Sequence, residues 1–183
     1  MAAGDGLVSM KPTSIVHAGT SASINADGGV DFSAVTSLSL NGVFTSDYDN
    51  YLIVFGADST GGGAEPNMFI RMRTAGTDAS ASNYTYQTLI AAASTVSGGR
   101  QSSQAEAQIG RIANTETVLH IHVYGPYLAQ PTAARGVIGV GKDGAYIIDC
   151  AATHSLSTSY DGITIYPSSD SMNGNVHVFG YEE

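Results

Sequence analysis

Apolar and polar side chains alternate along short stretches of this chain. In residues 68–73 the methionines and the isoleucine share one face of an extended segment, whereas Arg71 and Arg73 share the other, solvent-facing side. Residues 119–124 repeat the alternation with leucine, isoleucine and valine. A period of two residues is typical of antiparallel strands with one packed and one wet face. No stretch shows a sustained 3.6-residue period, so the pattern predicts an all-β fold.

Such segments recur between clusters of turn-forming residues. We expect strands at 30–34, 37–41, 50–56, 68–74, 84–91, 106–112, 117–124, 134–140, 145–151, 162–166 and 175–181. Turn signals separate many of them, among them Asn41-Gly42, Gly98-Gly99, Asp161-Gly162 and Asn173-Gly174. Glycine adopts the positive φ that tight hairpin turns require. This spacing of strands predicts a sandwich or a barrel.

The beginning of the chain differs from the rest in composition. Residues 1–28 are small, polar and weakly patterned, with one short apolar segment at Ser14-Ile15-Val16-His17. A segment that buries little apolar surface stays mobile or orders against a partner. We therefore expect an extended N-terminal arm over 1–28 and a single β-domain over 29–183.

Composition and charge narrow the function classes. The 183 residues include 22 glycines, and the formal net charge is −9 with only seven Lys and Arg. A chain with so few basic residues lacks the clustered positive surface that nucleic acid or an anionic membrane requires. We therefore expect neither as a partner.

Two features resemble catalytic signatures without their structural context. Gly139-Val140-Gly141-Lys142-Asp143-Gly144 matches G-x-G-x-x-G, but a dinucleotide site needs a helix after this loop, and a predicted strand follows here. A β-hairpin turn at 142–144 is the better interpretation. Cys150, the single cysteine, lies in an apolar run and is expected to be a buried structural thiol. We predict no catalytic residue, no cofactor and no enzyme activity.

Three histidines are the candidates for a metal site. His120 and His122 project from the same face of one strand, and His177 alternates with valines on another. Two ligands on one strand bind a metal weakly without a third, so solvent-facing or subunit-facing histidines are the alternative. A stack of histidines around an oligomer axis is a further possibility, and it would make assembly sensitive to pH.

Tyrosine is the most frequent aromatic residue, with ten copies against five phenylalanines and no tryptophan. Its ring is apolar and its hydroxyl polar, which suits protein interfaces and contacts with glycans. The tyrosines expected to be exposed are Tyr84, Tyr86, Tyr124 and Tyr127.

A longer pattern resembles that of tailed-phage virion structural proteins. It consists of a small apolar strand, a Phe-Thr-Ser turn and a Tyr-x-x-Tyr segment that leads into another apolar strand. The residues that carry it are Leu38, Leu40, Phe44, Tyr48, Tyr51, Ile53 and Val54, followed by Ile70-Arg71-Met72-Arg73, Ser82-Asn83-Tyr84, Tyr160-Asp161-Gly162-Ile163 and Asn173 to Tyr181. The resemblance covers about residues 30–181.

This resemblance implies a jelly-roll-like β-sandwich that assembles as a homotrimer on a capsid, neck or tail. The expected function is therefore that of a capsid decoration or cement protein, or of a small tail or neck fibre, on the exterior of the virion. Its partners would be its own copies, the major capsid or tail and neck proteins, and a host surface glycan. Two alternatives remain: a carbohydrate-binding receptor-recognition module, and a metal-dependent jelly-roll enzyme that uses His120 and His122.

Overall fold

The computed structural model describes residues 6–62, 65–140 and 146–181. All the described secondary structure is β, and every pairing is antiparallel. The first strands are β1 (Val8–Ser9), β2 (Ser14–Ile24), β3 (Val30–Asn41), β4 (Asn50–Ser59), β5 (Asn67–Thr74), β6 (Thr77–Asp78) and β7 (Tyr84–Ala92). They are followed by β8 (Thr95–Gln104), β9 (Ala107–Arg111), β10 (Thr117–Tyr124), β11 (Thr132–Val140), β12 (Tyr146–His154), β13 (Gly162–Pro167) and β14 (Met172–Tyr181).

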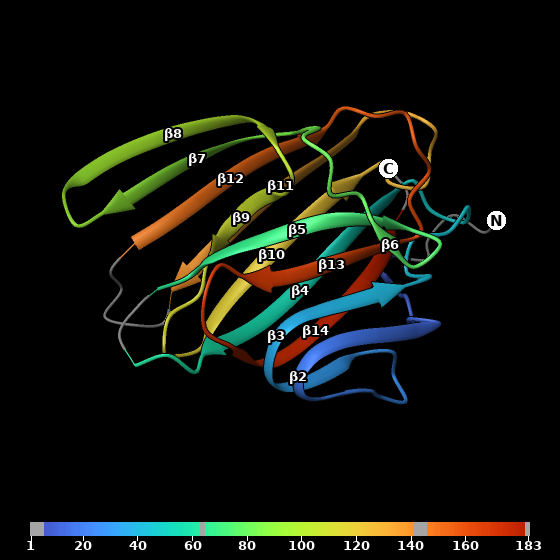
Figure 1. Cartoon of the computed structure of the whole chain (residues 1–183), viewed down its shortest axis with the longest axis horizontal. Coiled ribbons are helices and arrows are strands. Elements are labelled where there is room, and N and C mark those ends of the chain that lie inside the picture. Colours follow the sequence, from blue (N-terminus) through green and yellow to red (C-terminus); the bar gives the residue numbers. More distant parts are fainter. Residues whose placement is uncertain (1–5, 63–64, 141–145, 182–183) are drawn as a thin grey trace.

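The strands form one strongly curled sheet (Figure 1). Its order is β6-β5-β13-β3-β14-β4-β10-β11-β12-β7-β8, with β1 paired to β14, β2 to β3 and β9 to β5. Strand β9 also lies against β11 and β12, and so connects the two halves of the curl. No described residue belongs to a helix that could cross a membrane. The prediction of an all-β antiparallel fold is confirmed.

The core lies on the inner face of the curl. Strand β10 contributes Leu119, Ile121 and Val123, and all three are fully buried. The neighbouring strand β4 contributes Tyr51, Ile53 and Phe55 in the same way, and Phe55 stacks on Phe32 of β3 at a ring distance of 5.5 Å. Burial alternates along these strands because one face packs inward and the other points outward. Their period-two pattern in the sequence is this alternation.

Most predicted strands are present, with small shifts at their ends. The two segments expected at 30–34 and 37–41 form one continuous strand, β3. Ala34 and Gly19 have positive φ beside a register shift between β2 and β3, which explains why the pattern breaks there. Strand β8 was not predicted, because its ten residues include no alternating apolar set. The hairpin turn predicted at 142–144 lies outside the described residues.

The segment predicted as an N-terminal arm adds two strands to the sheet. Strand β1 pairs with the end of β14, and β2 pairs with β3 over almost its whole length. Most side chains of β2 are exposed, so backbone hydrogen bonds hold this strand more than apolar contacts do. The role of the arm on a partner, and the boundary at 28/29, stay predictions.

Candidate functional site

The outer face of the curled sheet carries the candidate site. Side chains alternate across a strand, so the residues between the buried positions of β10, β11, β12 and β7 point outward together. The strand register places Arg135 beside Ala151, Ala151 beside Gln87, and Gln87 beside Arg100. This row crosses β11, β12, β7 and β8. At about 4.8 Å per strand, its ends are about 14 Å apart.

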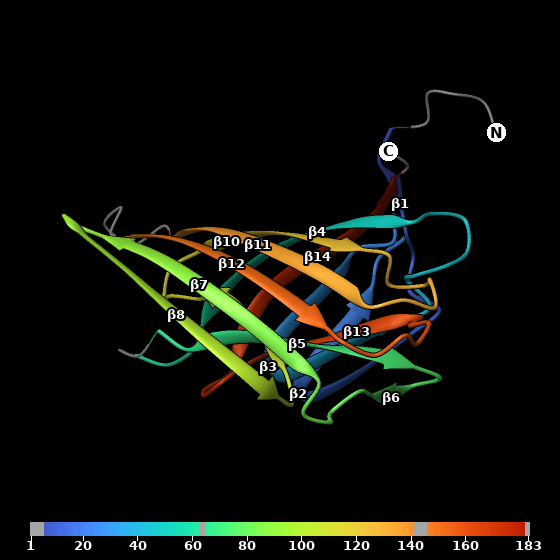
Figure 2. The same cartoon turned by 90° about the horizontal axis from the view of Figure 1, so that it is seen from above.

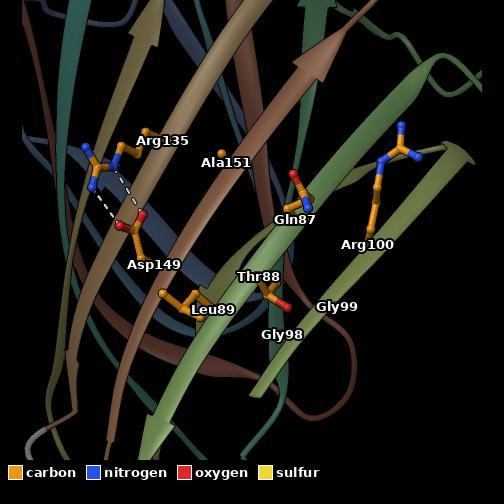
Figure 3. Close-up of a pocket in the computed structure, with 9 residues that line it drawn as sticks. All are labelled: Gln87, Thr88, Leu89, Gly98, Gly99, Arg100, Arg135, Asp149 and Ala151. Atoms are coloured by element: carbon orange, nitrogen blue, oxygen red, sulfur yellow. Dashed lines mark hydrogen bonds and ion pairs between the residues drawn. The ribbon is translucent and has the colours of Figure 1, made fainter. Parts of the chain in front are cut away.

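A second row runs parallel to the first. It contains Val137 of β11, Asp149 of β12, Leu89 of β7 and Gly98 of β8, again by direct pairing. Residues of both rows line an open groove of about 550 Å³ (Figure 3). The groove is lined by Gln87, Thr88, Leu89, Gly98, Gly99, Arg100, Arg135, Asp149 and Ala151. A volume of this size is typical of small-ligand sites.

An ion pair fixes the polar end of the groove. The Nε of Arg135 donates to Oδ1 of Asp149 at 3.1 Å, and Nη2 donates to Oδ2 at 2.6 Å. This two-bond geometry orients both planar groups. The hydrogen bonds from Arg135 hold the pKa of the Asp149 carboxyl below its usual value, although burial opposes this. Asp149 is therefore an anion at neutral pH, with lone pairs left for a ligand.

The β7–β8 hairpin forms the other wall and has little packed beneath it. Strand β8 is the last strand of the sheet and is exposed at nine of its ten positions. Figure 2 shows the hairpin projecting beyond the rest of the curled sheet. Gly98 and Gly99 have no side chains, so the backbone of β8 is open to a ligand at this point.

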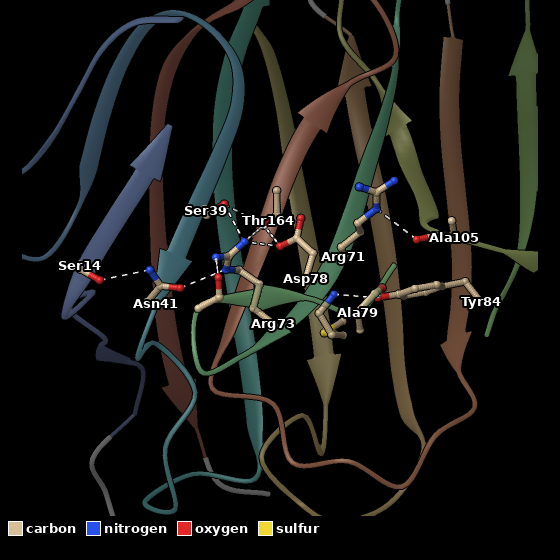
Figure 4. Close-up of polar contacts among 12 residues, drawn as sticks. Ser14, Ser39, Asn41, Arg71, Arg73, Asp78, Ala79, Tyr84, Ala105 and Thr164 are labelled. Carbon is tan, nitrogen blue, oxygen red and sulfur yellow. Dashed lines mark hydrogen bonds and ion pairs between the residues drawn. The ribbon is translucent and has the colours of Figure 1, made fainter. Parts of the chain in front are cut away.

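A second polar cluster is structural. Arg73 of β5 is 6% exposed, and its guanidinium donates to Ser39 at 3.0 Å and to Thr164 at 2.9 Å (Figure 4). It also pairs with Asp78 of β6 and donates to Asn41 at 3.0 Å. Our prediction of a solvent-facing Arg73 was wrong, because β6 and its hydrogen-bonding partners enclose the charge. These contacts anchor the β5–β6 turn and use the donors of the Arg73 guanidinium.

The predicted metal candidates lie on the outer face without forming a cluster. His120 and His177 flank Val54 in one row, and the Nδ1 of His122 lies 3.1 Å from the hydroxyl of Tyr181. The described part of the chain holds no group of three or more His, Cys, Asp or Glu residues placed to bind a metal ion. The metal-dependent alternative therefore stays a prediction.

The tyrosines divide between the core and the surface. Tyr84 is buried, and its hydroxyl accepts from the Met72 N–H and donates to the Ala79 carbonyl, both at 2.9 Å (Figure 4). The prediction of an exposed Tyr84 was wrong, because this hydroxyl replaces water with backbone partners. Tyr86 and Tyr124 are half-buried, and Tyr127 is exposed. No tyrosine lines the groove.

Two further titratable groups, Cys150 and His154, are buried. Cys150 is buried as expected, and burial raises the pKa of its thiol to about 12, so it is inert at neutral pH. His154 was not anticipated: it is 2% exposed and its Nδ1 lies 3.0 Å from the hydroxyl of Tyr160. Burial lowers the pKa of His154. Its position at the end of β12, outside the apolar run, gave no signal in the sequence.

Comparison with known proteins gives no sequence match and several distant structural ones. No family model matches the sequence, and no curated protein matches it. The structure is similar to the CBM2 module of the evolved Dit protein of Lactobacillus casei BL23 phage J-1, with 11% identity, coverage of 97% of this chain and 99% of that one, and a TM-score of 0.40. It is also similar to Domain 4 of AbnA, a GH43 extracellular arabinanase from Geobacillus stearothermophilus in complex with arabinotriose. That match has 9% identity, covers 96% of this chain and 92% of that one, and has a TM-score of 0.42.

A third match is a mutant of the GH43 protein BlXynB from Bacillus licheniformis. It has 8% identity and a TM-score of 0.42, covering 91% of this chain and 32% of that one. This chain therefore spans about a third of the length of BlXynB. Two of the three similar structures are domains of nearly this chain's length, one described as a carbohydrate-binding type and one bound to an oligosaccharide. At these identities and TM-scores, the likeness does not extend to a shared site.

Proposed function

We propose that this protein is a non-catalytic carbohydrate-recognition domain that binds its ligand in the groove over β11, β12, β7 and β8. The observation that carries the proposal is the groove itself. It is open, it holds about 550 Å³, and it combines charged and amide side chains with the apolar side chains of Leu89 and Ala151. Few polar groups on a largely preformed surface are typical of small-ligand sites.

The chemistry of the lining suits hydroxyl-rich ligands. Each sugar hydroxyl donates one hydrogen bond and accepts others, so a sugar site needs both donors and acceptors. Asp149 accepts, Arg135 donates, and the amide of Gln87 does both. Ala151 and Leu89 supply the apolar surface between them. No aromatic ring lines the groove, so hydrogen bonds supply most of the recognition and single sugars bind weakly.

A blocking substitution tests the site. Ala151 is exposed on the groove floor, and Ala133 is exposed on the same sheet face outside the groove. Wild-type protein is screened against a panel of soluble and insoluble polysaccharides by pull-down and affinity electrophoresis. We expect Ala151→Leu to remove binding, because the larger side chain fills the floor between Arg135 and Gln87. The matched control Ala133→Leu should bind like the wild type.

Two results would contradict the proposal. Wild-type protein that binds no polysaccharide in the panel removes the carbohydrate function. Binding that survives Ala151→Leu but is lost in Ala133→Leu places the site elsewhere on this face. Both variants are checked by circular dichroism and thermal unfolding, so that a loss of fold is not read as a loss of binding.

A second observation favours an assembly role in a virion. Exposed aliphatic side chains gather on one part of the outer face, in neighbouring rows across β10, β11, β12, β7 and β8. This aliphatic patch consists of Val118, Val137, Ile147, Leu89 and Val96. Val96 is 66% exposed and Ile147 62% exposed. Contiguous apolar surface of this kind marks protein contacts, and the uncovered edge of β8 can pair with another chain.

The assembly role is tested by light scattering with size-exclusion chromatography. A homotrimer that attaches to capsid, neck or tail should elute at three times the monomer mass. We expect Val96→Lys and Ile147→Lys to shift this mass toward the monomer, because each places a charge in the patch. Leu156→Lys, at an exposed site outside the patch, is the control. This role would be refuted if the wild-type protein stayed monomeric at every concentration and if electron microscopy of purified virions, labelled with antibodies against this protein, showed no label.

A further inference from the structure

Arg100 is unusual among the guanidinium groups of this protein. Three others are ion-paired in the structure, Arg71 with Glu106, Arg73 with Asp78 and Arg135 with Asp149. The Nε of Arg111 donates to Asn67 at 3.0 Å. Arg100 is exposed on β8, and its side chain has no ion pair or hydrogen bond with any residue that the structure describes. Its five N–H donors are therefore available to a ligand.

The free guanidinium lies in the groove. Arg100 pairs directly with Gln87 across the β7–β8 hairpin, and both side chains line the groove (Figure 3). The one carboxylate of the lining, Asp149, already binds Arg135 through both of its oxygens. The lining therefore carries a net positive charge on a chain whose formal net charge is −9. On an acidic protein, an isolated positive site attracts an anion to that one place on the surface.

The numbers of hydrogen-bond donors and acceptors in the groove also favour an anionic ligand. Arg100 offers donors only, Arg135 keeps donors beyond the two that Asp149 uses, and Gln87 adds an amide N–H₂. Donors in the groove therefore outnumber free acceptors. A neutral sugar, which brings donors and acceptors in similar numbers, leaves some of these donors without a partner. A ligand with additional acceptors satisfies them.

We propose that the groove binds an acidic carbohydrate, and that Arg100 binds the anionic substituent of one of its sugars. This inference rests on the proposed carbohydrate function and adds the ligand class to it. The shared chemistry is a planar or tetrahedral oxyanion, either a carboxylate or a sulfate ester, which the guanidinium fork contacts through two N–H groups. Arg135, about 14 Å away along the row, and its partner Asp149 contact the hydroxyls of another sugar further along the same chain.

Matched ligands separate the charge from the sugar. Oligogalacturonate is compared with its methyl-esterified form, which has the same backbone without the carboxylate charge. A sulfated oligogalactan is compared with its unsulfated form, so that the two sources of the anion are distinguished. Binding is measured by NMR titration of the wild type, Arg100→Gln, Arg100→Lys and the control Lys11→Gln. The control removes one exposed positive charge from outside the groove.

We expect wild-type protein to prefer one anionic ligand over its neutral partner by about three- to tenfold, since the contact is charged but solvent-exposed. Arg100→Gln should abolish this preference, because it weakens binding of the anionic ligand much more than binding of the neutral one. Arg100→Lys should retain part of it, because the charge remains without the fork. Lys11→Gln should keep the full preference. Added salt should reduce the wild-type preference, since exposed charges are screened.

Three outcomes would overturn the inference, and they differ in whether they also refute the carbohydrate function. Equal binding of anionic and neutral ligands by the wild type refutes it while the carbohydrate function remains. A preference that persists in Arg100→Gln refutes the assignment to this residue. No binding of any ligand, neutral or anionic, refutes the inference and the carbohydrate function together.

Discussion

Strands β10 and β8 lie in the same sheet but are made in different ways. In β10, fully buried Leu119, Ile121 and Val123 alternate with outward-facing residues. In β8 nine of ten residues are exposed, and only the pairing with β7 places the chain there. Strand β10 is held by burial on its inner face and by a neighbour on each side. Strand β8 has one neighbour and almost no buried surface.

The difference separates stability from recognition. The inward side chains of β10 are buried in the core, where a ligand cannot contact them. The β7–β8 hairpin extends past that core, so its side chains and the backbone of its outer strand remain available. The groove forms where these two kinds of strand meet, with Arg135 and Asp149 on the packed strands and Arg100 on the projecting one.

The largest expected effect comes from removing buried side-chain volume. Ile121→Ala in β10 should reduce the free energy of unfolding by about 2–5 kcal/mol, because it deletes buried methyl groups and leaves a cavity. Val96→Ala in β8 should change it by less than about 0.5 kcal/mol, because Val96 is 66% exposed. Urea unfolding followed by circular dichroism measures both. A large loss in Val96→Ala at high protein concentration would show that a second copy covers the aliphatic patch.

The packed half of the molecule could be predicted from the sequence. Alternation specified the strands of the core, and the apolar run around position 150 specified a buried thiol. Antiparallel pairing followed from the absence of helical segments between strands. Buried polar residues did not follow, because their burial depends on partners distant in sequence. Arg73 is enclosed by Thr164, and Tyr84 bonds the backbone of Met72.

The site could not be predicted, for a related physical reason. Residues 95–104 have no apolar period, so only the partner strand β7 reveals that they are extended. The ion pair joins Arg135 and Asp149 across a strand pair whose register the sequence does not state. Composition did indicate that cations are rare, with seven in the chain. It did not show that Arg100 is the groove cation left without a carboxylate.

Substitution of glycines in the packed strand β11 and in the exposed strand β8 should have a smaller effect on stability. A Cβ at Gly136 of β11 would lie 2.6 Å from the carbonyl oxygen of Ile109, within the core. Gly136→Ala should therefore cost about 1–3 kcal/mol of unfolding free energy through overpacking. A Cβ at Gly99 of β8 would lie 3.5 Å from the Thr88 hydroxyl, an ordinary contact. Gly99→Ala should leave stability unchanged or raise it slightly, and thermal unfolding distinguishes these results. Equal losses at both sites would contradict the distinction.

The smallest expected effect is that of pH on stability, through the histidines. His154 lies in the packed half, where its ring is 4.4 Å from that of Tyr84 and its Nε2 has no hydrogen-bond partner among the described residues. Burial lowers the pKa of His154 from 6.5, and no charged residue opposes this shift. His17, on β2 at the opposite part of the sheet, is exposed. Burial of the His154 ring therefore couples its protonation to folding.

The direction of the pH effect follows from where the proton binds. Below pH 6.5, His154 takes up a proton in the unfolded chain but not in the folded protein. The contribution of this group to stability is therefore complete above pH 6.5 and is lost as the pH falls toward the lowered pKa. His154→Phe keeps an aromatic ring beside Tyr84 and Tyr160 but cannot take up a proton. It should be less stable than the wild type at pH 7.5 because the Tyr160 hydroxyl loses its partner, yet it should lose less stability between pH 6.5 and 5. His17→Gln should retain the wild-type slope, and an unchanged slope in His154→Phe would show that other groups control the acid response.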